Sequence, residues 1–195
     1  MLFRSTRADW QRDIQPICNK ADVDHVPWTY GFVGIRGLLS ASDREAKIQW
    51  FVQRYEAFKM QQPANAQLPS IIAHSYGSYI VAMAMMRYPQ ICFHHVVLCG
   101  SIIPRVFDWD AALANKQFQR LLNDYGRKDA WPRVAEWVIP DAGSSGYAGF
   151  EHLAGDKVVQ RENQFWGHSS YFTLLNFEKR WMPFLARGED PPDVA

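Results

Sequence analysis

The chain has 195 residues, and its 21 Lys and Arg residues nearly balance 20 Asp and Glu residues, which leaves a formal net charge of +1. This length suits one domain with a sizeable core, and a hydrophobic content of 48% excludes an intrinsically disordered chain. The balanced charge argues against binding to nucleic acid or to an anionic membrane surface. We expect a single domain over residues 1–195 with a frayed tail from about residue 187.

The predicted elements alternate between helices and strands along the chain. Apolar residues three or four positions apart predict helices, whereas short runs of β-branched and apolar residues predict buried strands. The first elements in chain order are a helix over 7–20, a strand over 23–33, a helix over 44–61 and a strand over 68–73. The following ones are a helix over 77–88, strands over 94–100 and 119–123, a helix over 130–137, a strand or extended loop over 158–162, and a helix over 170–185. This order predicts an α/β fold, a three-layer α/β/α sandwich with a mostly parallel central sheet.

Cysteine content and the distribution of apolar residues bear on the compartment. The three cysteines, Cys18, Cys92 and Cys99, are an odd number without a CxxC pair, which excludes a disulfide framework and a cysteine-rich zinc site. The first ten residues, MLFRSTRADW, lack the apolar stretch of a secretory signal. The longest apolar run covers residues 79–86, whereas a membrane-spanning helix needs about 20 residues. We expect a cytoplasmic protein without a membrane span.

The most informative stretch is IIAHSYG, residues 71–77, which lies between an apolar strand and a helix. It has the pattern small-x-Ser-x-Gly with Ser75 at its centre. A serine at such a strand-to-helix turn is strained, its hydroxyl projects, and the helix directs its N–H groups and positive dipole end towards it. The alternative is a serine that only caps the helix. We favour a nucleophile, with His74 beside it as a candidate substrate-binding residue.

Residues 68–104, LPSIIAHSYGSYIVAMAMMRYPQICFHHVVLCGSIIP, resemble the nucleophile elbow, its helix and the next strand of the α/β-hydrolase family, which includes serine esterases and lipases. The resemblance implies a triad in the chain order Ser, acid, His, with the histidine late in the chain. It places the acid at Asp129 in a glycine-containing loop after a strand, with Asp124 as the competitor. It places the base at His168 before the final helix, with His152 as the alternative. Asp129 could instead only cap the helix that follows it.

The resemblance also implies an oxyanion hole built from two backbone N–H groups. The residue after the nucleophile, Tyr76, supplies the first of them. The second belongs to a loop near the N-terminus that commonly carries a His-Gly pair, which this chain lacks together with the strand before it. Arg4 and Ser5 are the nearest substitutes, and we assign the role to Ser5. The chain is accordingly either the later part of a longer product or a reduced variant with a damaged oxyanion hole.

Together these features predict a serine hydrolase that acts on an ester or related acyl bond of a small molecule. Ser75 would attack the acyl carbon, His168 would act as base and then as acid, and Asp129 would orient His168. We expect no cofactor and no metal, because the chain has no HExxH motif, no Walker A loop and no GxGxxG after a strand. Two alternatives stay open: an inactive hydrolase-like binding module, and transfer of the acyl group to an acceptor other than water.

Overall fold

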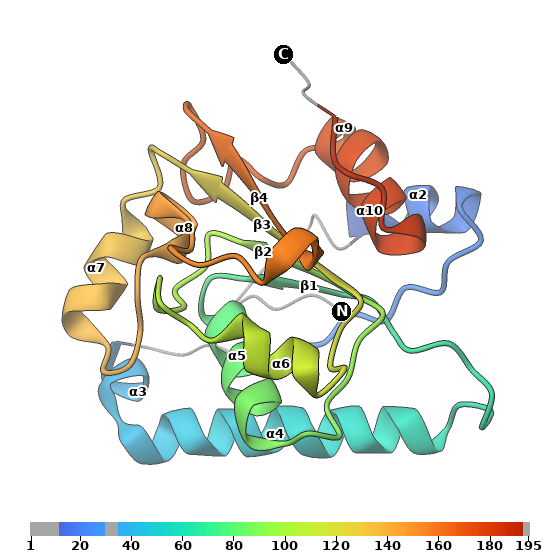
Figure 1. Cartoon of the computed structure of the whole chain (residues 1–195), viewed down its shortest axis with the longest axis horizontal. Coiled ribbons are helices and arrows are strands. Elements are labelled where there is room, and N and C mark those ends of the chain that lie inside the picture. The colour runs from blue at the N-terminus through green and yellow to red at the C-terminus, as the bar shows by residue number, and fades with distance from the viewer. Residues whose placement is uncertain (1–11, 30–34, 193–195) are drawn as a thin grey trace.

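The structure is a computed structural model that describes residues 12–29 and 35–192, and it has an α/β fold (Figure 1). Its centre is a four-stranded sheet in the order β1-β2-β3-β4, and all neighbouring strands pair in parallel. The strands are β1 (Ile71–His74), β2 (His95–Cys99), β3 (Arg120–Gly126) and β4 (Val158–Asn163). Because the strands are parallel, their carboxyl ends meet at one edge of the sheet.

Helices occupy most of the remaining described chain. Before the sheet come α2 (Gln15–Lys20), α3 (Ile35–Leu39) and α4 (Ala41–Met60). Between the strands come α5 (Tyr76–Arg87), α6 (Trp109–Ala114), α7 (Trp131–Val138), α8 (Ser145–Ala148) and the 3-10 helix η1 (Gly155–Lys157). After β4 come α9 (Leu174–Asn176), the π-helix η2 (Phe177–Trp181) and α10 (Met182–Arg187). None of the described helices is long and apolar enough to cross a membrane.

The core lies on both faces of the sheet, which explains why the strands are nearly continuous apolar runs. Ile71, Val96 and Leu121 are register partners on one face, and they pack in the same buried cluster as residues of α4 and α5. Ile72 and Val97 lie on the other face and belong to a second cluster with residues of α2, η2 and α10. Figure 1 shows α4 and α5 on one side of the sheet and α2 and α10 on the other.

Most predicted elements are confirmed to within a few residues, but the strand predicted over 23–33 is wrong in its described part. Residues 23–29 form no strand, and residues 30–33 lie outside the described part. Trp28 is 2% exposed and packs edge-on against Phe51 and Phe58 of α4, at ring-centroid distances of 5.9 and 6.0 Å. Trp28, an aromatic residue that favoured the strand prediction, therefore packs against α4 from an irregular segment.

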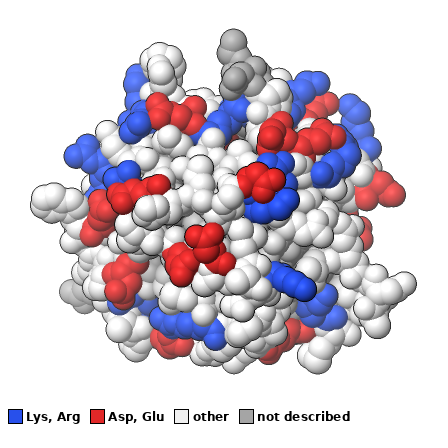
Figure 2. Space-filling view, in the orientation of Figure 1, with Lys and Arg blue, Asp and Glu red and all other residues white. Residues whose placement is uncertain are grey.

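The predicted terminal helices are shorter or displaced. Of the helix predicted over 7–20, the structure describes residues 12–20, which include α2, and residues 7–11 lie outside the described part. The final helix begins at Leu174 instead of residue 170, where the hydroxyl of Thr173 accepts a hydrogen bond from Asn176 N–H (3.2 Å). In the segment after α10, Asp190 forms an ion pair with Arg120 (2.6 Å). Lys and Arg side chains are interspersed with Asp and Glu over the face in Figure 2.

Candidate active site

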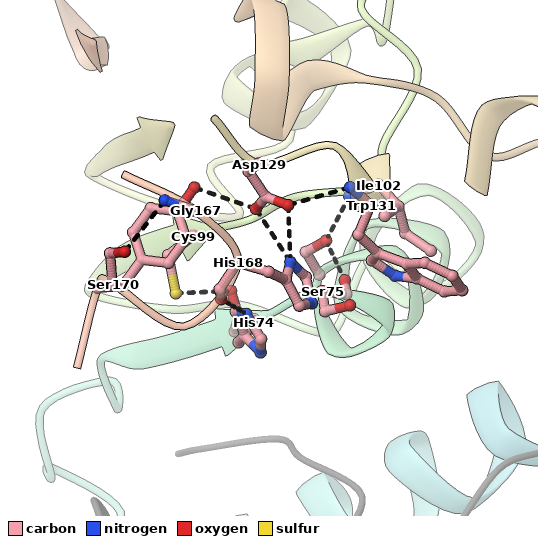
Figure 3. A network of polar contacts seen from close by, with 12 residues as sticks. His74, Ser75, Cys99, Ile102, Asp129, Trp131, Gly167, His168 and Ser170 are labelled. Atoms are coloured by element: carbon pink, nitrogen blue, oxygen red, sulfur yellow. Dashed lines mark hydrogen bonds and ion pairs between the residues drawn. The ribbon is translucent and has the colours of Figure 1, made fainter. Parts of the chain in front are cut away.

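The three residues predicted to form a triad all follow carboxyl ends of strands in the parallel sheet. Ser75 comes directly after β1, Asp129 follows β3, and His168 follows β4. In open α/β sheets, the carboxyl ends of the strands are where ligands bind. The sheet therefore brings segments far apart in sequence to one polar network, shown in Figure 3.

Ser75 occupies the single-residue turn between β1 and α5 in a strained backbone conformation, with φ of 54° and ψ of −124°. Such a conformation costs a non-glycine residue about 1–3 kcal/mol and persists only where the surroundings enforce it. Here Ser75 N–H donates to the carbonyl of Cys99 on β2 (3.1 Å), and its carbonyl accepts from the hydroxyl of Ser78 (2.5 Å). The Ser75 side chain makes no capping hydrogen bond to α5.

Asp129 and His168 form the central contact of the site. Nδ1 of His168 lies 3.0 and 2.9 Å from the two carboxylate oxygens of Asp129, which is fully buried. A carboxylate only accepts hydrogen bonds, so Nδ1 carries the proton, and Nε2 of the neutral ring is an acceptor. The His168 side chain is 31% exposed. This arrangement gives His168 the tautomer that a general base needs.

Two further donors hold the Asp129 carboxylate in place. Trp131 N–H donates to Oδ1 (3.2 Å), and the hydroxyl of Tyr171 donates to Oδ2 (3.3 Å). Burial raises the pKa of Tyr171, and the negative charge of Asp129 raises it further, so this hydroxyl stays protonated. The N-cap of α7 is Ala130 and not Asp129, although Asp129 accepts from the N–H of Trp131, the first residue of α7, and contacts His168 at the same time.

His74 contacts the backbone of the residue predicted to be the base. It is 3% exposed, and its Nε2 lies 2.9 Å from the carbonyl oxygen of His168. Because a carbonyl only accepts, Nε2 of His74 is the donor. The two imidazole rings lie 4.4 Å apart between centroids. The contact links the turn at Ser75 to the loop that carries His168, whereas binding of substrate by His74 stays a prediction.

Gly100, directly after β2, is a residue that the sequence analysis did not select. Its φ is +53°, and a Cβ added there would lie 3.0 Å from Oδ2 of Asp129 and 3.1 Å from both Nδ1 of His168 and Nε2 of His74. Only glycine combines this backbone conformation with so little space. The sequence signal was a glycine ending a buried strand at the carboxyl edge. No comparable signal identifies Tyr171, Trp131 or Ser78.

The two competing residues have different surroundings. Asp124 is also fully buried, but its oxygens accept hydrogen bonds from Nδ2 of Asn163 (2.6 Å) and from Nε1 of Trp181 (2.9 Å). Burial raises the pKa of Asp124, while these hydrogen bonds and the charge of Arg180 oppose the rise. His152 is exposed in the loop after α8. Of the two candidate acids, Asp129 is therefore the one that contacts a candidate base, through Nδ1 of His168.

The predicted oxyanion donors are described only in part. Tyr76 is the first residue of α5, where backbone N–H groups lack carbonyl partners within the helix. The positive end of the dipole of this twelve-residue helix lies at the same point. Ser5 and Arg4 lie outside the described residues. Within the described ranges, no group of three or more His, Cys, Asp or Glu residues could hold a metal ion.

Comparison with known proteins does not assign the chain to a family. The chain matches no protein-family model, no curated protein and no solved structure in the comparisons made. A fold of the α/β class carries many unrelated chemistries. The side chains of the site are therefore the features that bear on function.

Proposed function

We propose that the chain is a serine hydrolase of the α/β-hydrolase type that cleaves an ester or related acyl bond. The observation that carries the proposal is the contact of His168 Nδ1 with both oxygens of the buried carboxylate of Asp129, in a network that includes the turn at Ser75. A buried carboxylate that orients a histidine, combined with a serine at a strained strand-to-helix turn, is the arrangement of a Ser-His-Asp triad.

The fold is in keeping with this proposal. Ser75, Asp129 and His168 follow strands in the chain order Ser, acid, His that is typical of this architecture. Apolar clusters cover both faces of the parallel sheet, which supports a three-layer α/β/α arrangement. The strained φ of Ser75 gives the sharp turn that exposes a nucleophile at the top of such a sheet.

In the proposed mechanism, Oγ of Ser75 attacks the acyl carbon while Nε2 of His168 takes the hydroxyl proton. Asp129 stabilises the resulting imidazolium through Nδ1, and the N–H of Tyr76 donates to the oxyanion that forms on the former carbonyl oxygen. The tetrahedral intermediate collapses, the leaving oxygen takes the proton from His168, and the acyl group stays on Ser75. A water molecule then attacks the acyl carbon as it gives a proton to His168, the bond from the acyl carbon to Oγ of Ser75 breaks, and His168 returns the proton to Oγ as the acid leaves.

A fluorophosphonate probe tests the proposal without a choice of substrate. The probe should add to Ser75, as mapped by mass spectrometry, because only a serine activated by a base attacks it readily. Ser75→Ala should abolish the adduct and leave the thermal unfolding temperature nearly unchanged, and His168→Ala should strongly reduce labelling. Ser42→Ala, at an exposed serine of α4, is the matched control and should label like the unaltered chain.

The same experiment separates the two hypotheses left open by the sequence. If the folded chain carries no adduct at Ser75, the hydrolase proposal is wrong and an inactive binding module is favoured. If an adduct forms, hydrolysis of p-nitrophenyl esters with and without added alcohols distinguishes transfer to water from transfer to another acceptor.

A further inference from the structure

The turn at Ser75 is held on two sides by the end of β2 and by the segment that follows it. Ser75 N–H donates to the carbonyl of Cys99, the last residue of β2 (3.1 Å). On the other side of the turn, the hydroxyl of Ser78 donates to the carbonyl of Ser75 (2.5 Å) and accepts the N–H of Ile102 (3.2 Å). Ser75 and Ile102 both belong to the polar network in Figure 3. The hydroxyl of Ser78 therefore connects the carbonyl of the turn to the segment after β2.

Ser78 lies in the first turn of α5 and is fully buried. A serine hydroxyl in a helix often bonds to a carbonyl three or four positions earlier, and such a bond by itself says nothing about function. Ser78 differs from this common case in two respects. Its acceptor is the carbonyl of a residue with a strained φ of 54°, and the same hydroxyl accepts an N–H from outside the helix. Because a carbonyl only accepts and a hydroxyl has one proton, the direction of both bonds is fixed.

The carbonyl of Ser75 and the N–H of Tyr76 belong to one peptide unit. A peptide unit is planar and trans, so its C=O and N–H point in opposite directions and rotate together. The Ser75 carbonyl is directed into the first turn of α5, where the N–H of Ser78 also donates to it (2.9 Å). The Tyr76 N–H therefore points out of the amino end of α5, at the edge of the sheet that carries Asp129 and His168. A group that fixes the carbonyl of Ser75 also fixes the direction of this N–H.

The two ends of this peptide are anchored independently of Ser78. On one side, Ser75 N–H is bonded to β2 through the carbonyl of Cys99. On the other side, the Tyr76 side chain is 5% exposed, and its ring stacks on that of Tyr79 with centroids 5.8 Å apart and an interplanar angle of 13°. Rotation of the peptide plane between these anchors changes the direction of the Tyr76 N–H. The hydrogen bond from Ser78 to the carbonyl opposes this rotation.

We propose that Ser78 is a positioning residue of the oxyanion hole, because its hydroxyl orients the N–H of Tyr76 through the peptide that joins Ser75 to Tyr76. The inference rests on the proposed hydrolase function, in which this N–H donates to the oxyanion. Ser78 acts through the backbone of the turn and not on the substrate. Its hydrogen bond to the carbonyl also polarises the peptide, which makes the N–H a stronger donor. A donor that is already oriented needs no reorganisation when negative charge develops on the substrate.

The test compares labelling of the full chain by a fluorophosphonate and by its thiono analogue, which has P=S in place of P=O. Attack by Ser75 moves negative charge onto the phosphoryl oxygen, a good acceptor for the Tyr76 N–H, whereas sulfur is a weak acceptor. The oxygen-to-sulfur ratio of the labelling rates therefore reports on the oxyanion hole, while a change in the nucleophilicity of Ser75 alters both rates equally. Ser78→Ala should lower the rate with the fluorophosphonate by roughly 10-fold, less than the ~10²–10³-fold for loss of an oxyanion donor, and should lower the ratio several-fold.

Ser101→Ala is the matched control. Ser101 is also fully buried, its hydroxyl accepts the N–H of Ile103 (3.3 Å), and it contacts the hydroxyl of Ser145 (3.0 Å). Ser78→Ala and Ser101→Ala each leave a buried N–H without its acceptor, so both should lower the unfolding temperature by several degrees. Only Ser78→Ala should lower the oxygen-to-sulfur ratio. Ser78→Cys nearly keeps the side-chain volume and supplies a weak donor, so it should fold and give an intermediate ratio.

NMR supplies a readout that needs no reactive serine. The carbonyl carbon signal of Ser75 and the amide nitrogen signal of Tyr76 should shift in Ser78→Ala and stay in place in Ser101→Ala, and unshifted signals in Ser78→Ala overturn the inference. If the unaltered chain is labelled at Ser75 but Ser78→Ala has the same ratio as Ser101→Ala, the inference is overturned and the hydrolase proposal stands. If Ser78→Ala does not fold, an unaltered ratio in Ser78→Cys overturns the inference. A folded chain that carries no label overturns the hydrolase proposal and this inference with it.

Discussion

Replacing Gly100 by alanine perturbs the proposed active site without removing any of its functional groups. The added Cβ would stand 3.0 Å from Oδ2 of Asp129 and 3.1 Å from both Nδ1 of His168 and Nε2 of His74. Ordinary contacts of a Cβ lie at 3.4–4 Å, so these atoms must move by a few tenths of an ångström. The substitution therefore tests whether the precise position of the Asp129–His168 pair matters for reactivity.

Two effects of different size are expected. The φ of +53° costs an alanine about 1–2 kcal/mol of stability, which corresponds to a fall of ~2–8 °C in the unfolding temperature for a chain of this size. A displacement of ~1 Å in an active site can cost 10²-fold in rate, so a few tenths of an ångström should lower kcat/KM by roughly 10-fold. The stability effect comes from the backbone, whereas the kinetic effect comes from the crowded side chains.

Gly155→Ala separates these effects. Gly155 has a nearly identical φ of +57°, but a Cβ added there meets no atom of the described residues within 4 Å. It should lose similar stability and keep full activity. The assays are thermal unfolding, ester hydrolysis or fluorophosphonate labelling, and the NMR signal of the Nδ1 proton of His168. Full activity in Gly100→Ala, or an equal loss in Gly155→Ala, would refute the argument from crowding.

Three further predictions concern other buried polar residues. Asp129→Asn should lower kcat/KM by ~10⁴-fold with little change in fold. Asp124→Asn should instead lower the urea midpoint, with a loss of ~1–3 kcal/mol of stability, and should leave the rate of the folded chain within a few-fold of the unaltered chain. A larger rate loss in Asp124→Asn than in Asp129→Asn would reverse the assignment of the acid. His74→Gln should lower kcat with KM unchanged if His74 acts through the carbonyl of His168, while a rise in KM alone would indicate contact with substrate. Burial lowers the pKa of His95 in the folded chain. On acidification the unfolded chain therefore binds a proton at this histidine before the folded chain does, and the free energy of unfolding falls as the pH drops through ~6.5. His95→Gln should flatten the pH dependence of the urea midpoint between about pH 7 and 5, and an unaltered slope would contradict this sign.

Strands of the sheet were predictable because burial on both faces demands continuous apolar runs that stand out from the surrounding sequence. The expected segments 68–73 and 94–100 coincide with β1 and β2 to within three residues. The same composition misleads around Trp28, whose burial comes from α4 and not from a sheet. Whether an aromatic residue faces a strand neighbour or a distant helix is a tertiary property that local pattern does not contain.

Residues of the candidate site could be selected from the sequence only where they follow chain order. The pattern around Ser75 and the order of Asp129 and His168 selected residues that the structure gathers in one network. The sequence did not indicate Gly100 and Tyr171, because their places in the candidate site depend on contacts across the sheet edge. Tyr171 reaches Asp129 over 42 positions of sequence, and no spacing rule links the two. The choice between Asp124 and Asp129 likewise needed their hydrogen-bond partners.

The placement of Ser75, Asp129 and His168 after three different parallel strands has a consequence for when the proposed reactivity would arise during folding. Pairing of parallel strands requires long crossovers, so such contacts form late in folding, whereas helices such as α4 can form early. During synthesis Ser75 leaves the ribosome well before His168, and the proposed nucleophile stays without its base until the last strand has docked. In a refolding experiment, helical circular dichroism should return before probe labelling at Ser75. Labelling would then report completion of the native sheet, and a partly folded chain would carry an unreactive serine.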